Sequence, residues 1–115
     1  MIRPGEIYLA DFDEMEPHRV IVISREELNR GEHVLVTFCT SKKFALRSRL
    51  KNCVAFKAGQ FGFSIDTVAQ CENLLSIEKT RLDLDLGPVG VLGELAMRDV
   101  IKAIGHVIES DCEPV

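Results

Sequence analysis

Apolar side chains along most of the chain fall into short runs with the two-residue period of β-strands. In residues 6–12 a two-residue period sets Ile7 and Leu9 against Tyr8 and Ala10, whereas residues 20–23 form an unbroken apolar stretch of the kind that is buried on both faces of a sheet. Residues 25–31 instead indicate a short helical turn that ends at Gly31. The pattern as a whole predicts strands over residues 6–12, 18–24, 33–40, 52–56 and 66–77, the last of them bent near its middle.

The period changes toward the C-terminus. Residues 80–87 alternate leucine with charged side chains and predict either a further strand or an extended edge of the sheet. Gly87, Pro88 and Gly90 then interrupt the pattern, and the apolar residues that follow recur at intervals of three and four. This predicts one amphipathic helix over roughly residues 93–109. Several strands followed by one helix predict a mainly β fold, a small curled sheet or barrel with a C-terminal helix packed against it.

Length and composition fit a single domain. The chain has 115 residues, of which 46% are hydrophobic, enough for a core that needs no disulfide or metal. We assign residues 1–110 to this domain and residues 111–115 to a polar tail. No apolar run reaches the roughly 18 residues that a membrane-spanning helix needs, and the N-terminal sequence lacks the pattern of a signal peptide. We therefore expect a cytoplasmic protein that does not enter a membrane.

The cysteines and histidines form no pattern typical of a metal site. The four cysteines stand singly, with no Cys-x-x-Cys pair and no histidine at the spacing of a zinc ligand. In a reducing cytosol such cysteines are expected to be small buried hydrophobes. The sequence therefore predicts no cofactor and no bound metal.

Charge is distributed unevenly along the chain. The formal net charge is −4, yet residues 33–65 contain no Asp or Glu, and their basic residues are Lys42, Lys43, Arg47, Arg49, Lys51 and Lys57. Two interpretations are open, a solvated loop without a partner or a segment that contacts the phosphates of a single-stranded nucleic acid. Phe44 lies among the basic residues and can stack on a base, whereas core packing explains Phe61 and Phe63 better.

Two polar residues stand at the ends of consecutive predicted strands. If strands 18–24 and 33–40 pair antiparallel, Arg19 at the start of one approaches Thr40 at the end of the other. A guanidinium, a hydroxyl and adjacent lysines make a good phosphate-binding set. The alternative is structural, with Arg19 paired to Glu14 or Glu16 and Thr40 present because strands favour threonine.

Four segments occur in an order and at a spacing that resemble a known family: RPGEIYLADFD, HRVIVIS, VTFCTS and CENLLSIEKTRL. The family is the MazF/PemK group of toxins from bacterial toxin–antitoxin pairs, which are ribosome-independent endoribonucleases. The resemblance covers about residues 3–109, nearly the whole chain. It implies a small SH3-like β-barrel of the CcdB/MazF type and a homodimer whose RNA groove runs along the dimer interface. It also implies a cognate antitoxin with an acidic disordered segment that lies across the basic loop.

The same resemblance implies roles for individual residues. Arg19 and Thr40 take the positions of the family's catalytic arginine and threonine, and Glu72 takes that of an acidic residue near the site. The implied reaction is attack of an RNA 2′-hydroxyl on the adjacent phosphorus, which gives a 2′,3′-cyclic phosphate without a metal. Arg19 would neutralise the phosphorane, Thr40 would orient an oxygen, and Glu72 or His18 would accept the proton. The residues expected to bind RNA are His18, Ser41, Lys42, Lys43, Phe44, Arg47, Arg49, Lys51 and Gln70.

The chain also departs from the family pattern. The turn between the first two strands is short, Val20 replaces a proline, Gln70 replaces a basic residue of one branch, and Glu72 replaces the usual Asp. Other classes of function therefore stay open beside the toxin endoribonuclease. One is a non-catalytic nucleic-acid-binding module, including a gyrase poison like CcdB, although the chain lacks the tryptophan on which CcdB-like action is expected to depend. Another is a barrel whose basic loop recruits a protein partner.

Overall fold

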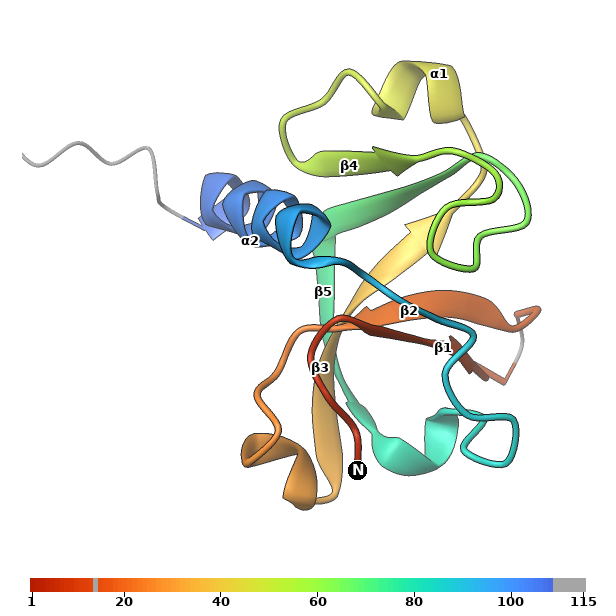
Figure 1. The fold of residues 1–115 in the computed structure, drawn as a ribbon, viewed down its shortest axis with the longest axis vertical. Helices are drawn as coiled ribbons and strands as arrows, with labels where there is room; N and C mark the ends of the chain where they lie inside the picture. The colour runs from red at the N-terminus through yellow and green to blue at the C-terminus, as the bar shows by residue number, and fades with distance from the viewer. Residues whose placement is uncertain (14, 109–115) are drawn as a thin grey trace, which may run out of the picture.

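The computed structural model describes residues 1–13 and 15–108, which form one curled antiparallel sheet and a long C-terminal helix (Figure 1). The sheet has six strands in the order β4-β5-β3-β2-β1-β6, and it forms a half-barrel with β4 and β6 at its edges. The predicted fold class is therefore confirmed. The strands are β1 (Glu6–Ala10), β2 (His18–Val22), β3 (His33–Thr40), β4 (Cys53–Phe56), β5 (Thr67–Glu78) and β6 (Gly90–Val91), and the α-helices are α1 (Phe44–Arg47) and α2 (Glu94–Ile108).

The five strands predicted from the two-residue period are all present, and the predicted helical turn contains a 3-10 helix, η1 (Leu28–Arg30). The bend expected in β5 is a bulge. Thr37 of β3 pairs with Leu74, whereas the next residue, Phe38, pairs with Gln70, so residues 71–73 have no partner on β3. Such extra residues bend a strand and increase its twist. Figure 1 shows β5 changing direction near α2, which turns one long strand into two arms of the curled sheet.

The segment 80–87 follows the predicted extended edge only in part. Asp11 donates its backbone N–H to Arg81 and Asp83 donates its own to Leu9, each at 2.8 Å, so residues 81–83 lie along β1, whereas residues 84–86 form a turn. The segment begins in a 3-10 helix, η2 (Lys79–Arg81), and makes one isolated bridge from Leu82 to Ala10. Leu82 is buried, but Leu84 and Leu86 are exposed, because the chain turns where Leu86 donates its backbone N–H to the Asp83 carboxylate at 3.0 Å. Aspartate favours such turns, and this preference outweighs the alternation of leucines. The sixth strand is instead β6, which pairs with Glu6 and Ile7 of β1.

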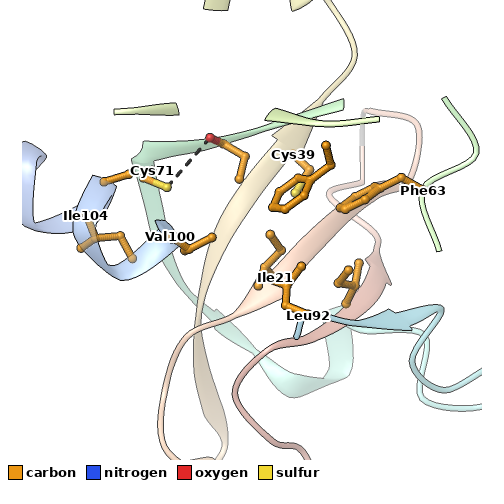
Figure 2. Close-up of a cluster of buried hydrophobic side chains, with 11 residues drawn as sticks. Ile21, Cys39, Phe63, Cys71, Leu92, Val100 and Ile104 are labelled. Carbon is orange, nitrogen blue, oxygen red and sulfur yellow. Dashed lines mark hydrogen bonds between the residues drawn. The ribbon is translucent and has the colours of Figure 1, made fainter. Parts of the chain in front are cut away.

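Both faces of the sheet are buried. Val20, Ile21 and Val22 of β2 have no exposed surface, as their unbroken apolar run predicts. On the face covered by α2, the core residues are Ile7, Ile21, Cys39, Phe56, Phe63, Ala69, Cys71, Leu92, Val100, Ala103 and Ile104 (Figure 2). On the opposite face they are Ile2, Tyr8, Ala10, Val20, Val22, Val34, Val36, Phe38 and Leu82. Cys39, Cys53 and Cys71 are buried free thiols, as predicted, and Cys112 lies outside the described residues.

The helix α2 buries one face against the sheet. Val100, Ala103 and Ile104 enter the core, which confirms the amphipathic helix predicted for residues 93–109 up to Ile108. Residue 109 and the predicted tail, 111–115, lie outside the described residues. Within the described part of the chain, no helix is both long and apolar enough to span a membrane.

A close backbone crossing fastens the segment between β4 and β5, residues 57–66, to the segment that leads into α2. A Cβ atom on Gly62 would overlap the backbone of Val89, and one on Gly90 would overlap the carbonyl oxygen of Phe61. Both positions therefore accept only glycine without a backbone shift. The crossing holds Phe63 in the core, where its ring stacks on Phe56 with centroids 5.1 Å apart.

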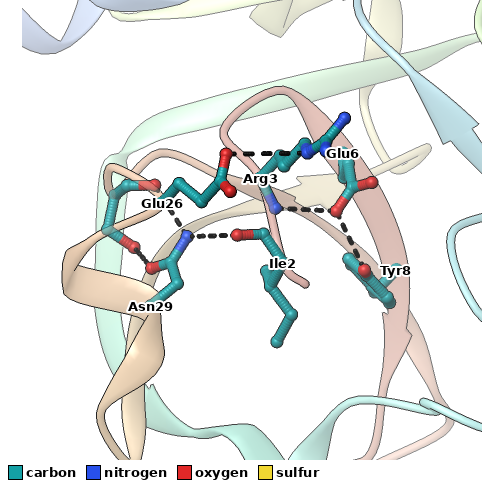
Figure 3. A network of polar contacts seen from close by, with 7 residues as sticks. Ile2, Arg3, Glu6, Tyr8, Glu26 and Asn29 are labelled. Carbon is teal, nitrogen blue, oxygen red and sulfur yellow. Dashed lines mark hydrogen bonds and ion pairs between the residues drawn. The ribbon is translucent and has the colours of Figure 1, made fainter.

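A polar network ties the N-terminus to the end of the sheet where β2 finishes (Figure 3). The buried Asn29 amide donates to the backbone carbonyls of Ile2 and Ser24 at 3.0 and 2.9 Å. The hydroxyl of Tyr8 donates to the Glu6 carboxylate at 2.9 Å. Burial and this bond to an anion raise the pKa of Tyr8 to about 12, so its hydroxyl stays protonated and holds Glu6 in place.

Candidate active site at the ends of β2 and β3

The antiparallel pairing of β2 and β3 brings Arg19 and Thr40 to the same end of the sheet. Val20 pairs with Phe38, and Ile21 pairs with Thr37, so the first residues of β2 lie beside the last residues of β3. A pocket of about 220 Å³ opens there, lined by Glu16, Pro17, His18, Arg19, Cys39, Thr40, Ser41, Lys42, Ile65 and Thr67. The predicted proximity of Arg19 and Thr40 is thus confirmed, and His18, Ser41 and Lys42 join them.

Arg19 presents a hydrogen-bond donor that the described chain leaves unused. Its Nε atom is buried and has no hydrogen-bond partner among the described residues. The alternative interpretation of Arg19 is an ion pair with Glu14 or Glu16. The described part of the chain has no ion pair between Arg19 and Glu16, and Glu14 lies outside the described residues. A buried donor without an acceptor costs about 1–3 kcal/mol, which an anionic ligand in the pocket would relieve.

Cys39 forms an inert wall of this pocket. Burial, together with the neighbouring Cys71 thiol, raises the pKa of Cys39, and the nearby Arg19 guanidinium lowers it by less. The thiol therefore stays neutral and behaves as a small apolar group. The positive charge of Arg19 is consequently not compensated by a thiolate from Cys39.

The hydroxyl of Thr40 is already oriented by the chain. The backbone N–H of Lys42 donates to Thr40 Oγ1 at 3.2 Å, which leaves the hydroxyl proton to donate elsewhere. Lys43 then adopts a left-handed backbone conformation, with φ of 55°, and α1 begins at Phe44. Arg47 donates from Nη1 to the carbonyl oxygen of Lys42 at 3.1 Å. This short helix was not predicted, and it gives the basic segment a defined shape next to the pocket.

His18 lines the pocket, but Glu72 does not. The His18 ring lies 4.5 Å from that of Phe38 between centroids, and its Nδ1 donates to the carbonyl oxygen of Glu16 at 2.6 Å. This bond leaves Nε2 as the atom that can accept a proton. Glu72 lies in the β5 bulge and accepts hydrogen bonds from Asn52 at 2.9 Å and Gln70 at 3.4 Å. His18 therefore lies where it can reach a ligand in the pocket, whereas Glu72 and Gln70 lie outside it.

The remaining predicted RNA contacts extend away from the pocket along the basic segment. Lys43, Arg49 and Lys51 are exposed, and Arg47 is partly buried. The ring of Phe44 has a cation beside it, because the Lys57 ammonium lies 5.4 Å from its centroid, and Lys57 also pairs with Asp66 at 3.7 Å. The stacking of Phe44 on a base stays a prediction. Phe63 is in the core and Phe61 packs against it, which confirms the packing interpretation of both.

Sequence reasoning missed Ile65 and Thr67 as residues of the pocket. They lie there because Thr40 pairs with Val68, which places the residues before β5 beside the end of β3. The pairing of β3 with β5 joins strands that are far apart in sequence, so the local pattern of residues does not predict it. No local pattern in the sequence marks Ile65, whose side chain is exposed in the structure. Across residues 1–13 and 15–108, no three His, Cys, Asp or Glu side chains gather as metal ligands would.

Fold and pocket together define a small mainly β protein that presents an arginine, a threonine and a run of basic residues at one end of a half-barrel. The family of PemK-like, MazF-like toxins of type II toxin–antitoxin systems matches residues 3–108, and the chain belongs to this family. A comparison with curated proteins gave no match.

Solved structures share this fold at low sequence identity. A mycobacterial endoribonuclease in complex with its cognate antitoxin has a TM-score of 0.77 and 16% identity, with 94% of this chain and 95% of that chain covered. The toxin MazF-mt6 of Mycobacterium tuberculosis has a TM-score of 0.75 and 21% identity, with coverage of 90% and 96%. MazF in the MazE–MazF complex of Deinococcus radiodurans has a TM-score of 0.73 and 13% identity, with coverage of 93% and 94%.

Proposed function

We propose that the protein is the toxin of a type II toxin–antitoxin pair and that it cleaves single-stranded RNA in the pocket at the ends of β2 and β3. The observation that carries this proposal is the buried Nε of Arg19, which has no hydrogen-bond partner among residues 1–13 and 15–108 and lies in the same pocket as the Thr40 hydroxyl. A phosphodiester supplies the acceptor that this donor lacks. Membership of the toxin family supports the same conclusion.

The proposed reaction needs no nucleophile from the protein. The RNA 2′-oxygen forms a bond to phosphorus, the bond from phosphorus to the 5′-oxygen breaks, and the products carry a 2′,3′-cyclic phosphate and a 5′-hydroxyl. His18 Nε2 takes the proton of the 2′-hydroxyl, and water or Arg19 protonates the leaving oxygen. Arg19 binds the non-bridging oxygens as their charge increases, and Thr40 fixes the orientation of one of them. No metal is required in this scheme. Glu72 is the alternative base if bound RNA extends across Gln70.

The proposal includes the partners and location of such a toxin. The solved complexes of the mycobacterial endoribonuclease and of MazF contain an antitoxin, and a cognate antitoxin with an acidic segment suits the basic residues beside this pocket. A homodimer is part of the same proposal, and the exposed apolar side chains of Ile101 and Ile108, which lie on one face of α2, offer surface for it. The protein acts in the cytoplasm, where messenger RNA is accessible.

Cleavage in the presence of EDTA tests the proposal, and Thr40 provides the matched variants. Thr40→Val removes the hydroxyl at nearly constant shape, so we expect kcat/KM on a mixed-sequence RNA to fall about 10–100-fold, the effect of one hydrogen bond to a charged group. Thr40→Ser keeps the hydroxyl and should stay close to wild type. Product ends are identified by mass spectrometry. Cleavage that needs added metal, or that leaves 5′-phosphates, contradicts the mechanism, and binding without cleavage favours the non-catalytic module.

The lysines that follow Thr40 should set the salt dependence of RNA binding. Each phosphate contact to a single strand contributes about 0.7 to the slope of log affinity against log salt concentration. Lys42→Ala combined with Lys43→Ala should therefore lower this slope by about 1.4. A fluorescence titration with non-cleavable RNA at several salt concentrations measures it. The control variant combines Arg25→Ala with Arg30→Ala. It removes the same charge beyond the other end of β2 and should change the slope little. Equal slopes in the two double variants would contradict the contact of Lys42 and Lys43 with RNA phosphates.

A further inference from the structure

A second cleft lies between α2 and the edge strand β4, outside the proposed cleavage pocket. Its volume is about 610 Å³, and its lining residues are Lys51, Cys53, Val54, Ala55, Asp99, Lys102, Ala103 and His106. None of them lines the pocket that contains Arg19 and Thr40. Figure 1 shows β4 beside α2, with the loop that precedes β4 close to the C-terminal half of the helix.

The cleft combines an apolar floor with a cationic rim. Cys53, Val54 and Ala103, which are buried or half-buried, supply the floor, and Ala55 is an exposed lining residue. On the rim, the ammonium groups of Lys51 and Lys102 are opposed by the single carboxylate of Asp99, and His106 adds its ring. Within the described chain neither lysine takes part in an ion pair, so both are available to an anion. Both are also exposed.

This chemistry fits a nucleotide. Ligand sites of about 300–1,000 Å³ are typically apolar with a few convergent polar groups. A base can lie against the apolar floor while its phosphate reaches the two lysines, which act as point charges.

The path of the chain indicates that the nucleotide belongs to the strand bound in the cleavage pocket. The basic segment begins in that pocket with Ser41 and Lys42 and ends in the cleft with Lys51. Between them it passes through α1, where Arg47 and the exposed Lys43 and Arg49 add positive charge. A single RNA strand that leaves the pocket along this segment therefore meets cations until it reaches the cleft.

We propose that the cleft between α2 and β4 is a second nucleotide subsite, which binds a base and phosphate of the substrate strand several nucleotides from the scissile bond. This inference rests on the proposed function, because it takes single-stranded RNA as the substrate. It assigns RNA binding to Lys102 and Ala55, which lie on elements that the cleavage pocket does not use.

A length series of RNA tests the subsite. Oligonucleotides with 2′-O-methyl groups cannot be cleaved, and wild-type affinity should rise when their length becomes sufficient to reach the cleft. Lys102→Ala should remove this gain, about tenfold in Kd, and leave the affinity for short oligonucleotides unchanged. Ala55→Trp places a large side chain in the cleft without changing the charge, and Ala55 is exposed, so the substitution does not disturb the core. We expect this variant to lose the length-dependent gain in affinity as well. Arg98→Ala is the control, since it removes one positive charge from α2 at a residue that does not line the cleft and pairs with Glu94.

The outcomes separate this inference from the proposed function. If wild type cleaves RNA but Lys102→Ala and Ala55→Trp bind long oligonucleotides as wild type does, the subsite is overturned and the function stands. If wild type cleaves no RNA, the function fails, whereas the length-dependent binding still reports on the subsite.

Two further results would give the cleft another ligand. If adenosine 5′-monophosphate binds in the cleft, and RNA affinity does not rise with oligonucleotide length, the cleft is a site for a free nucleotide. A synthetic peptide rich in Glu and Leu can also be tested. If it binds in the cleft, and Ala55→Trp does not change the affinity for RNA, the cleft is a protein-binding site. Either result overturns the proposal.

Discussion

Arg19→Met is expected to reduce RNA cleavage by a factor of about 10²–10³ or more, the effect of removing a preorganised donor from a developing oxyanion. Arg19→Lys should recover little of this activity, because an ammonium group is a point charge and cannot replace the planar fork of a guanidinium. The measurement is kcat/KM on RNA in the presence of EDTA. Arg25→Met, an exposed arginine beyond the other end of β2, is the matched control and should keep wild-type activity.

The stability of the same variant distinguishes a binding residue from a structural one. Within the part of the chain that the structure describes, the buried Nε of Arg19 has no hydrogen-bond partner, so its removal relieves a desolvation cost of about 1–3 kcal/mol. The free energy of unfolding of Arg19→Met should therefore equal or exceed that of wild type while cleavage is lost. A variant that cleaves normally, or one that loses activity only because it unfolds, would show that Arg19 does not serve the reaction.

Gly90→Ala is expected to lower the free energy of unfolding by about 3 kcal/mol, near the upper end of the cost of overpacking. The new Cβ would overlap the carbonyl oxygen of Phe61, and no side-chain rotation can move a backbone atom away. The backbone at Gly90 does not adopt a positive φ, so this loss is steric and not conformational strain. Denaturant unfolding followed by circular dichroism measures it.

Two other glycines provide controls for this prediction. Gly31 has no positive φ and no neighbour closer than 3.6 Å to an added Cβ, so Gly31→Ala should leave stability unchanged or raise it slightly. Gly59 has φ of 94° and open space around it, so Gly59→Ala reports the cost of backbone strain alone, about 1 kcal/mol. If all three variants have equal stability, the crossing of residues 61–62 and 89–90 contributes nothing to the fold.

Much of the fold could be predicted because its strands carry clear local patterns. The unbroken apolar run of β2 predicted burial on both faces, and the length of β5 predicted a bend that the structure shows as a bulge. The alternating leucines of residues 80–87 were misleading as evidence for a strand. Alternation describes only the spacing of side chains, and it does not reveal the turn that Asp83 stabilises. The short helix α1 was also missed, because four residues are too few to show a helical period.

The candidate site was predictable to the extent that it depends on neighbouring strands. Consecutive strands usually pair antiparallel, and this alone places Arg19 near Thr40. Ile65 and Thr67 lie in the pocket because β3 pairs with β5, although β4 separates these strands in sequence. No local sequence pattern predicts that pairing. Glu72 shares strand β5 with Thr67, but its position in the bulge directs it to Asn52 and away from the pocket.

The glycine crossing fixes one wall of the candidate active site in place. Residues 57–66 carry Ile65 on the pocket wall, Phe63 in the core and Gly62 under the backbone of Val89. The segment cannot swing outward as a gate without withdrawing an aromatic ring from the interior. The Ile65 wall of the pocket therefore keeps its position as long as the core around Phe63 stays packed.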